Sequence, residues 1–158
     1  MTFRLNDRTA LQGAIGHMLG MHKYLLDSGL DPNLLELVNM RASQINGCAN
    51  CLALHAKTLR EAGEREDRLA VLPAWRETTW FTDRERAALA WTEAVTTLPN
   101  RDVPDDVFAQ ARAEFDEKEL ADLTLAIAAI NTANRFSIAF RQPPTPFTIA
   151  APEPVATA

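Results

Sequence analysis

The sequence lacks most of the features that mark membrane-bound, secreted or nucleic-acid-binding proteins. No apolar run approaches the roughly 20 residues that are needed to span a bilayer. The N-terminal segment MTFRLNDRTA carries charges but no apolar core, so no secretory signal is visible. The 16 basic residues are scattered among 21 acidic ones, whereas phosphate binding depends on clustered Lys and Arg. We therefore expect a cytoplasmic protein that has neither membrane nor nucleic-acid partners.

The sequence also lacks any pattern typical of β-strands. No stretch alternates between apolar and polar residues for long enough to indicate a sheet, and no internal repeat is present. The length suits one domain, which can bury about two thirds of its unfolded surface without a disulfide or a metal to hold it together. We predict an all-α, single-domain helical bundle of six to seven helices over residues 1–141, followed by an extended, proline-rich tail over residues 142–158.

Caps, breakers and apolar spacing predict where these helices begin and end. Asp31 and Pro32 supply an N-cap and a first-turn proline, Gly63 supplies a C-terminal stop, and Thr82 forms a capping box with Glu85. The predicted helices cover about residues 8–28, 31–43, 48–62, 66–72, 82–97, 103–115 and 117–140. The last contains LADLTLAIAAINTA, which is apolar nearly all round. Such a helix is buried in the core or against another subunit, so we expect a homo-oligomer.

The chain has only two cysteines, Cys48 and Cys51, and they stand three positions apart. Because the fold does not need them as a structural crosslink, and because cytosolic thiols are kept reduced, the pair indicates a redox or metal site. At about 100° per residue, both cysteines lie on the same face of the predicted helix as His55, Leu59 and Ala62. His55 follows Cys51 by four positions, the spacing at which helical side chains touch.

Each of these residues has a use in thiol chemistry. A thiol with a pKa near 8.5 is only about 3% ionised at pH 7, and a helix N-terminus with a nearby imidazole stabilises the reactive thiolate. His55 can accept and return a proton, and Glu36, which interrupts an apolar run, can orient the imidazole. Helical spacing places the Cα atoms of the two cysteines about 5–5.5 Å apart, which permits a disulfide. Cys48 can therefore resolve a sulfenic acid on Cys51.

Zinc or haem binding are the alternatives for this motif. Cys48, Cys51, His55 and Glu36 could supply four zinc ligands, but a structural site normally takes its second pair from a distant segment, and no second cysteine pair exists. Haem attachment requires a histidine directly after the second cysteine, where this chain has Leu52. The pattern therefore favours redox chemistry, and we expect no metal or cofactor.

The order Glu36, Cys48-x-x-Cys51, His55 resembles the signature of alkylhydroperoxidase D-like proteins within the carboxymuconolactone decarboxylase family. The segments ELVNMRASQINGCANCLALHAKTLREAG and WRETTWFTDRERAALAWTEAVTTL are also similar to the family's smaller bacterial members. The resemblance extends over about residues 15–140. It implies a helical fold of the alkylhydroperoxidase D type, assembly as trimers or hexamers, and peroxide reduction. By motif position, Cys51 would be peroxidatic, Cys48 resolving, and His55 with Glu36 the proton relay.

One position departs from the family pattern. Well-characterised members have a histidine directly before the second cysteine, where this chain has Asn50. The family's decarboxylase branch lacks the cysteine pair, so the resemblance disfavours decarboxylation.

Several other residues have an ordinary structural interpretation. We expect His17 and His22 to be partly exposed helix residues rather than substrate contacts. The tryptophans and methionines are expected to fill the core or an interface, although Met18, Met21 and Met40 could line an apolar approach to Cys51. Polar groups on the apolar last helix are expected to satisfy backbone or interface partners; they are Asn131, Asn134 and Arg135.

The function that this pattern favours is a thiol-dependent peroxidase. It would reduce hydrogen peroxide or small organic hydroperoxides at Cys51, cycle through a Cys48–Cys51 disulfide, and be restored by an external dithiol or thiol-protein reductant. Two alternatives stay open, namely a general disulfide oxidoreductase and a non-catalytic stress protein whose cysteines only sense oxidation.

Overall fold

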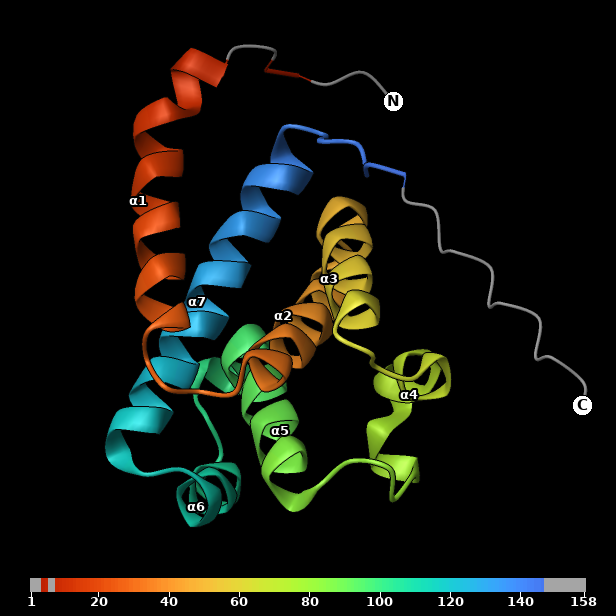
Figure 1. The fold of residues 1–158 in the computed structure, drawn as a ribbon. Helices are drawn as coiled ribbons and strands as arrows, with labels where there is room; N and C mark the ends of the chain where they lie inside the picture. Colours follow the sequence, from red (N-terminus) through yellow and green to blue (C-terminus); the bar gives the residue numbers. More distant parts are fainter. Residues whose placement is uncertain (1–3, 6–7, 147–158) are drawn as a thin grey trace, which may run out of the picture.

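The computed structural model describes residues 4–5 and 8–146, and this part of the chain is helical without a strand (Figure 1). The α-helices are α1 (Arg8–Leu26), α2 (Pro32–Asn46), α3 (Ala49–Glu61), α4 (Glu66–Val71), α5 (Asp83–Thr97), α6 (Asp105–Glu114) and α7 (Glu117–Ala139). Two 3₁₀-helices, η1 (Leu72–Glu77) and η2 (Pro99–Arg101), follow α4 and α5. The prediction of an all-α fold with six to seven α-helices is confirmed.

Local sequence signals account for most helix ends. The Asp31 side chain accepts the Asn33 N–H at the start of α2, and Thr82 and Glu85 form the predicted capping box of α5. The predicted end of α2 near residue 43 was three residues too early. Gly47 adopts a left-handed conformation with φ of 70°, and its N–H closes the last turn, so the helix continues to Asn46.

Two further differences concern segments next to prolines. The segment after α4 continues as η1 through Pro73, because a proline at the start of a helical turn gives up a hydrogen bond that would be missing there anyway. Of the predicted tail, residues 142–146 contain no helix, and residues 147–158 lie outside the described part.

Helix α2 organises the interior because it packs against α3, α5 and α7. One face of α2 joins a core made with α1, α5, α6 and α7, and the other joins a core made with α3, α4 and η1. Each fully buried Leu or Phe contributes about 1.5–3 kcal/mol relative to exposure. Helix α7 buries one face against the rest of the chain, with Leu123, Ile127 and Ile130 among its buried residues, and runs beside α1 (Figure 1).

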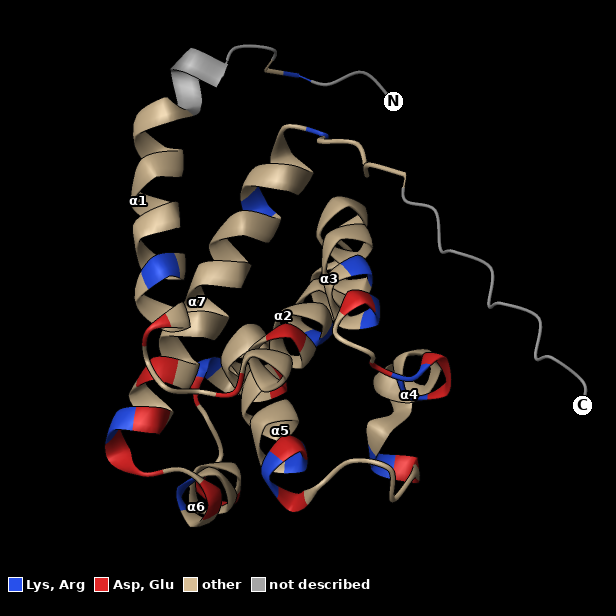
Figure 2. Ribbon diagram, viewed as in Figure 1, with Lys and Arg blue, Asp and Glu red and all other residues tan. Residues whose placement is uncertain are grey.

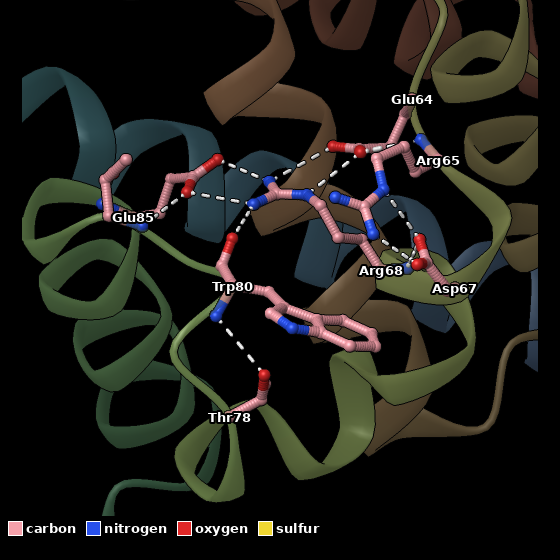
Figure 3. Close-up of polar contacts among 8 residues, drawn as sticks. Glu64, Arg65, Asp67, Arg68, Thr78, Trp80 and Glu85 are labelled. Carbon is pink, nitrogen blue, oxygen red and sulfur yellow. Dashed lines mark hydrogen bonds and ion pairs between the residues drawn. The ribbon is translucent and has the colours of Figure 1, made fainter.

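An ionic network attaches α4 to the start of α5 (Figure 3). Arg68 Nε lies 2.9 Å from Glu64 Oε1, and its Nη2 lies 2.6 Å from Glu85 Oε1. The same guanidinium donates to the backbone carbonyl oxygen of Trp80. Because Glu85 is also the capping-box residue of α5, one carboxylate fixes both the helix start and the preceding loop.

Charged side chains are unevenly distributed over the fold (Figure 2). They gather on α4, on α6 and on the first turns of α5 and α7, whereas residues 12–22 of α1 and 123–134 of α7 have none. In the described part of the chain, no helix has both the length and the apolar character that crossing a membrane requires. Ile130, in the uncharged segment of α7, packs against the two cysteines.

Candidate functional site

The two cysteines lie where α2 gives way to α3. Cys48 is the N-cap of α3, and Cys51 occupies the first turn, where unpaired N–H groups produce a positive potential. The two are joined by a disulfide, with Cα atoms 5.4 Å apart as helical spacing predicted. Both are buried, in a small apolar cluster with Ala42 and Ile130. The two sulfur atoms are therefore largely shielded from bulk solvent.

His55 and Glu36 form the pair that the sequence predicted. The Nδ1 atom of His55, on α3, lies 2.8 Å from Oε2 of Glu36, on α2. The two side chains are 10% and 17% exposed. Asn39 donates to the other oxygen of Glu36 at 3.4 Å. A carboxylate that accepts the Nδ1 proton leaves Nε2 as the free ring nitrogen, the one available for proton transfer.

These residues share a cavity of about 570 Å³ between α1, α2, α3 and α7. Cys51, His55 and Glu36 all line it, whereas Cys48 does not. Its walls are largely apolar, and the residues that form them include Met18, Leu25, Leu35, Leu54, Ala126 and Ile130. A cavity with apolar walls and a few polar groups around a reactive atom is typical of a site for small ligands.

Helix α1 forms one wall of the cavity and is attached to α7 by a polar contact. The Tyr24 hydroxyl donates to Asp122 Oδ1 at 2.9 Å, and Lys118 Nζ lies 2.7 Å from Oδ2. The hydrogen bond from Lys118 holds the pKa of Asp122 below its usual range, so this carboxylate stays charged at neutral pH. His17 and His22 on α1 are both exposed as expected, and His22 and Met18 also line the cavity.

Two other predicted residues lie away from this cavity. Met40 is buried in the core between α2 and α3, so core filling is correct for it. Ala62, placed on the same helical face as the cysteines, is exposed because it caps the end of α3.

Sequence reasoning missed Ser137. Its hydroxyl oxygen, on α7, lies 3.8 Å from the Cys51 sulfur, and Asn50 Nδ2 lies 3.4 Å from the same oxygen. A serine on the buried face of an apolar helix was the available signal, but nothing local links it to a cysteine 86 residues earlier. His55, by contrast, makes no direct hydrogen bond to Cys51 within the described residues.

A buried amide network fixes the end of α2 just before the cysteines. Asn46 Nδ2 donates to the side-chain oxygens of Asn131 and Asn134, and Asn134 Nδ2 donates to Ser43 Oγ at 3.0 Å. These side-chain contacts join α2 to α7 next to the cysteine pair. The predicted backbone partners are found for two residues, since Asn131 and Arg135 donate to the carbonyl oxygens of Ile127 and Asn131. Among the residues that the structure describes, no group of three or more His, Cys, Asp or Glu side chains is arranged to hold a metal ion.

Comparison with known proteins finds a family model and several relatives that resemble this chain. A sequence model of the carboxymuconolactone decarboxylase family matches residues 10–94. The uncharacterized protein YdfG of Bacillus subtilis is 40% identical over 122 residues, which are 77% of this chain and 83% of YdfG. The alkyl hydroperoxide reductase AhpD of Acidobacterium capsulatum is 39% identical over 62 residues, which are 39% of this chain and 32% of that protein.

Solved structures include a similar fold. A crystal structure of a protein of unknown function from Agrobacterium tumefaciens, suggested to be the antioxidant defence protein AhpD, matches with a TM-score of 0.87 and 37% identity. The match covers 92% of this chain and all of that one. The similarity therefore extends over the helices that build the cavity and the cysteine pair.

Proposed function

Because the chain is an alkylhydroperoxidase D-like member of the carboxymuconolactone decarboxylase family, we propose that it is a thiol-dependent peroxidase that reduces hydrogen peroxide or small organic hydroperoxides. One observation carries this proposal: Cys51, disulfide-bonded to Cys48, lines a cavity together with the hydrogen-bonded His55–Glu36 pair. These groups suffice for a complete oxidation cycle.

The first step is attack on the peroxide. The Cys51 thiolate attacks the distal oxygen of ROOH, an S–O bond forms as the O–O bond breaks, and Cys51 becomes a sulfenic acid while the alkoxide RO⁻ leaves. The alkoxide takes a proton from His55 and departs as ROH, or as water when the substrate is hydrogen peroxide. Glu36 stabilises the protonated imidazole that supplies this proton.

The second step closes the disulfide. The Cys48 sulfur attacks the sulfur of the Cys51 sulfenic acid, and the hydroxyl group leaves as water with the Cys48 proton. An external dithiol or thiol protein then reduces the disulfide by exchange and is itself oxidised to a disulfide. We place this cycle in the cytoplasm, where such reductants are abundant, and in a homo-oligomer of the trimeric or hexameric kind.

Turnover with peroxide and excess dithiol tests the proposal. We expect the wild type to turn over many times, Cys51→Ser to lose activity, and Cys48→Ser to be oxidised once and then stop as a sulfenic acid or mixed disulfide. Alkylation with a sulfenate-reactive probe followed by mass spectrometry would locate the trapped species. Full peroxidase activity in Cys51→Ser would contradict the assignment.

Two alternative functions would give different results in the same assay. A general disulfide oxidoreductase would reduce a protein disulfide faster than it consumes peroxide under one reductant. A non-catalytic sensor would be oxidised stoichiometrically and show no turnover in excess reductant. The apolar cavity beside Cys51 supports the peroxidase, because it can admit a small hydroperoxide directly to this sulfur.

A further inference from the structure

The hydroxyl group of Ser137 lies against the sulfur of Cys51. We propose that Ser137 is a further catalytic residue, which donates a hydrogen bond to the Cys51 thiolate and lowers the pKa of this thiol. The inference rests on the proposed function in that Cys51 is the residue that reacts. The contact joins α3 to α7 across the cavity, and Ser137 is itself only 7% exposed.

The direction of this hydrogen bond follows from the chemistry of its partners. The two atoms are 3.8 Å apart, within hydrogen-bonding range for sulfur. A disulfide sulfur or a thiolate has no proton to give, so the serine hydroxyl must be the donor. Hydrogen bonds to an ionised partner are roughly twice as strong as neutral ones, and the contact therefore favours the thiolate over the thiol.

In the disulfide form, the Ser137 hydroxyl donates to Gln142, and its proton can turn to Cys51 once that sulfur is ionised. Asn50 Nδ2 lies 3.4 Å from the serine oxygen and donates to it, so the oxygen already serves as an acceptor. The other acceptor within reach of the hydroxyl proton is Gln142 Oε1, at 3.3 Å. When Cys51 is ionised, its negative sulfur is the stronger acceptor, and the proton moves from the amide oxygen to the sulfur.

The other ionisable side chains that line the described cavity make no hydrogen bond to the Cys51 sulfur, so they do not substitute for Ser137. They are His22 from α1, Glu36 from α2 and His55 from α3, while α7 contributes no ionisable side chain to the described lining. The His55 ring is bonded to Glu36 through Nδ1. The structure thus separates two roles, with Ser137 stabilising the attacking sulfur and His55 serving the leaving oxygen.

Titration of Cys51 tests the proposal without any peroxide. In a Cys48→Ser background, the pH dependence of alkylation by iodoacetamide reports the Cys51 thiol pKa alone. We expect Ser137→Ala to raise this pKa by about one unit, a tenfold change in the ionisation constant. Ser137→Thr keeps a hydroxyl group and should restore the lower pKa. Thr132→Ala is the matched control, because its hydroxyl bonds to the Ala128 carbonyl oxygen at 2.9 Å, outside the cavity lining.

The outcomes separate this proposal from the peroxidase assignment. An unchanged pKa in a folded Ser137→Ala variant, or a Ser137→Thr variant that titrates like Ser137→Ala, would overturn the role of Ser137. Should Ser137→Ala fail to fold, Asn50→Leu removes the group that orients the hydroxyl, and it should raise the pKa by a smaller amount; no rise would equally overturn the proposal. A wild type without peroxide turnover would refute the peroxidase and leave this titration unaffected.

Discussion

The hydrogen bond between Glu36 and His55 places an oriented imidazole in the cavity with Cys51. A buried disulfide alone would offer no group that can transfer a proton. Glu36 interrupts an otherwise apolar stretch of α2, and its side chain is only 17% exposed. Removing a carboxylate from water is unfavourable unless a partner compensates for the loss. His55 provides that partner at 2.8 Å, and the carboxylate in turn stabilises the imidazole when it is protonated.

Glu36→Gln should therefore slow peroxide reduction while leaving the fold intact. Glutamine preserves the size of the side chain and an oxygen for Nδ1, but it removes the negative charge. We expect kcat/KM for peroxide to fall about ten- to a hundredfold, within the range of general acid–base contributions. Glu61→Gln is the control, since Glu61 lies on the exposed side of α3 and pairs with Lys57. Equal rates in wild type and Glu36→Gln would show that the carboxylate is not part of the relay.

Much of this site could be predicted from the sequence because its residues are close along the chain. Cys48, Cys51 and His55 fall within three turns of helix, where the helical repeat fixes their relative positions. Glu36 required the family motif, because its contact depends on how α2 packs on α3. Ser137 could not be predicted, since it meets Cys51 only through the packing of α7, 86 residues further on.

At the scale of elements, helix ends were predictable where a side chain or a glycine marks them. The capping box at Thr82 and the N-cap at Asp31 fixed the starts of α5 and α2. Boundaries were less certain where the decision depends on tertiary contacts. Helix α2 continues to Asn46, where Gly47 closes the last turn, and the Asn46 amide also donates to Asn131 and Asn134 on α7, an interaction that no local pattern reveals.

The four helices around the cavity determine which peroxides can approach Cys51. Ala129 on α7 lines the cavity, and a larger side chain there would occupy space that an organic hydroperoxide needs. We expect Ala129→Leu to lower kcat/KM for a bulky apolar hydroperoxide by about tenfold, with little effect on hydrogen peroxide. Ala128→Leu, at an exposed position on the same helix, is the matched control. Parallel loss of both activities would indicate general damage to the site and contradict this account of the cavity.

On the scale of the whole molecule, the uncharged end of the fold is also the end with the most exposed apolar side chains. Leu19 and Leu26 on α1 are 60% and 58% exposed, and Leu54 on α3 is 56% exposed. The sequence argument for an oligomer relied on the apolar last helix, but α7 is buried mainly within its own chain. The exposed apolar side chains of α1 therefore give the better reason to expect a homo-oligomer, because exposed apolar surface commonly marks an interface.

A charge placed on this face should prevent assembly. We expect the wild type to have a mass in light scattering at micromolar concentration that is a multiple of the 17.5 kDa chain, and Leu19→Glu to give the single-chain mass. Burying a carboxylate without a partner is costly, whereas the same substitution on an exposed monomer surface costs little. Leu98→Asp serves as the control, because Leu98 is 50% exposed but lies outside the helices that form the cavity. A wild type of single-chain mass would refute the oligomer. An oligomeric Leu19→Glu variant would instead place the interface elsewhere on the surface, since α1 could then not be the helix that a second copy covers.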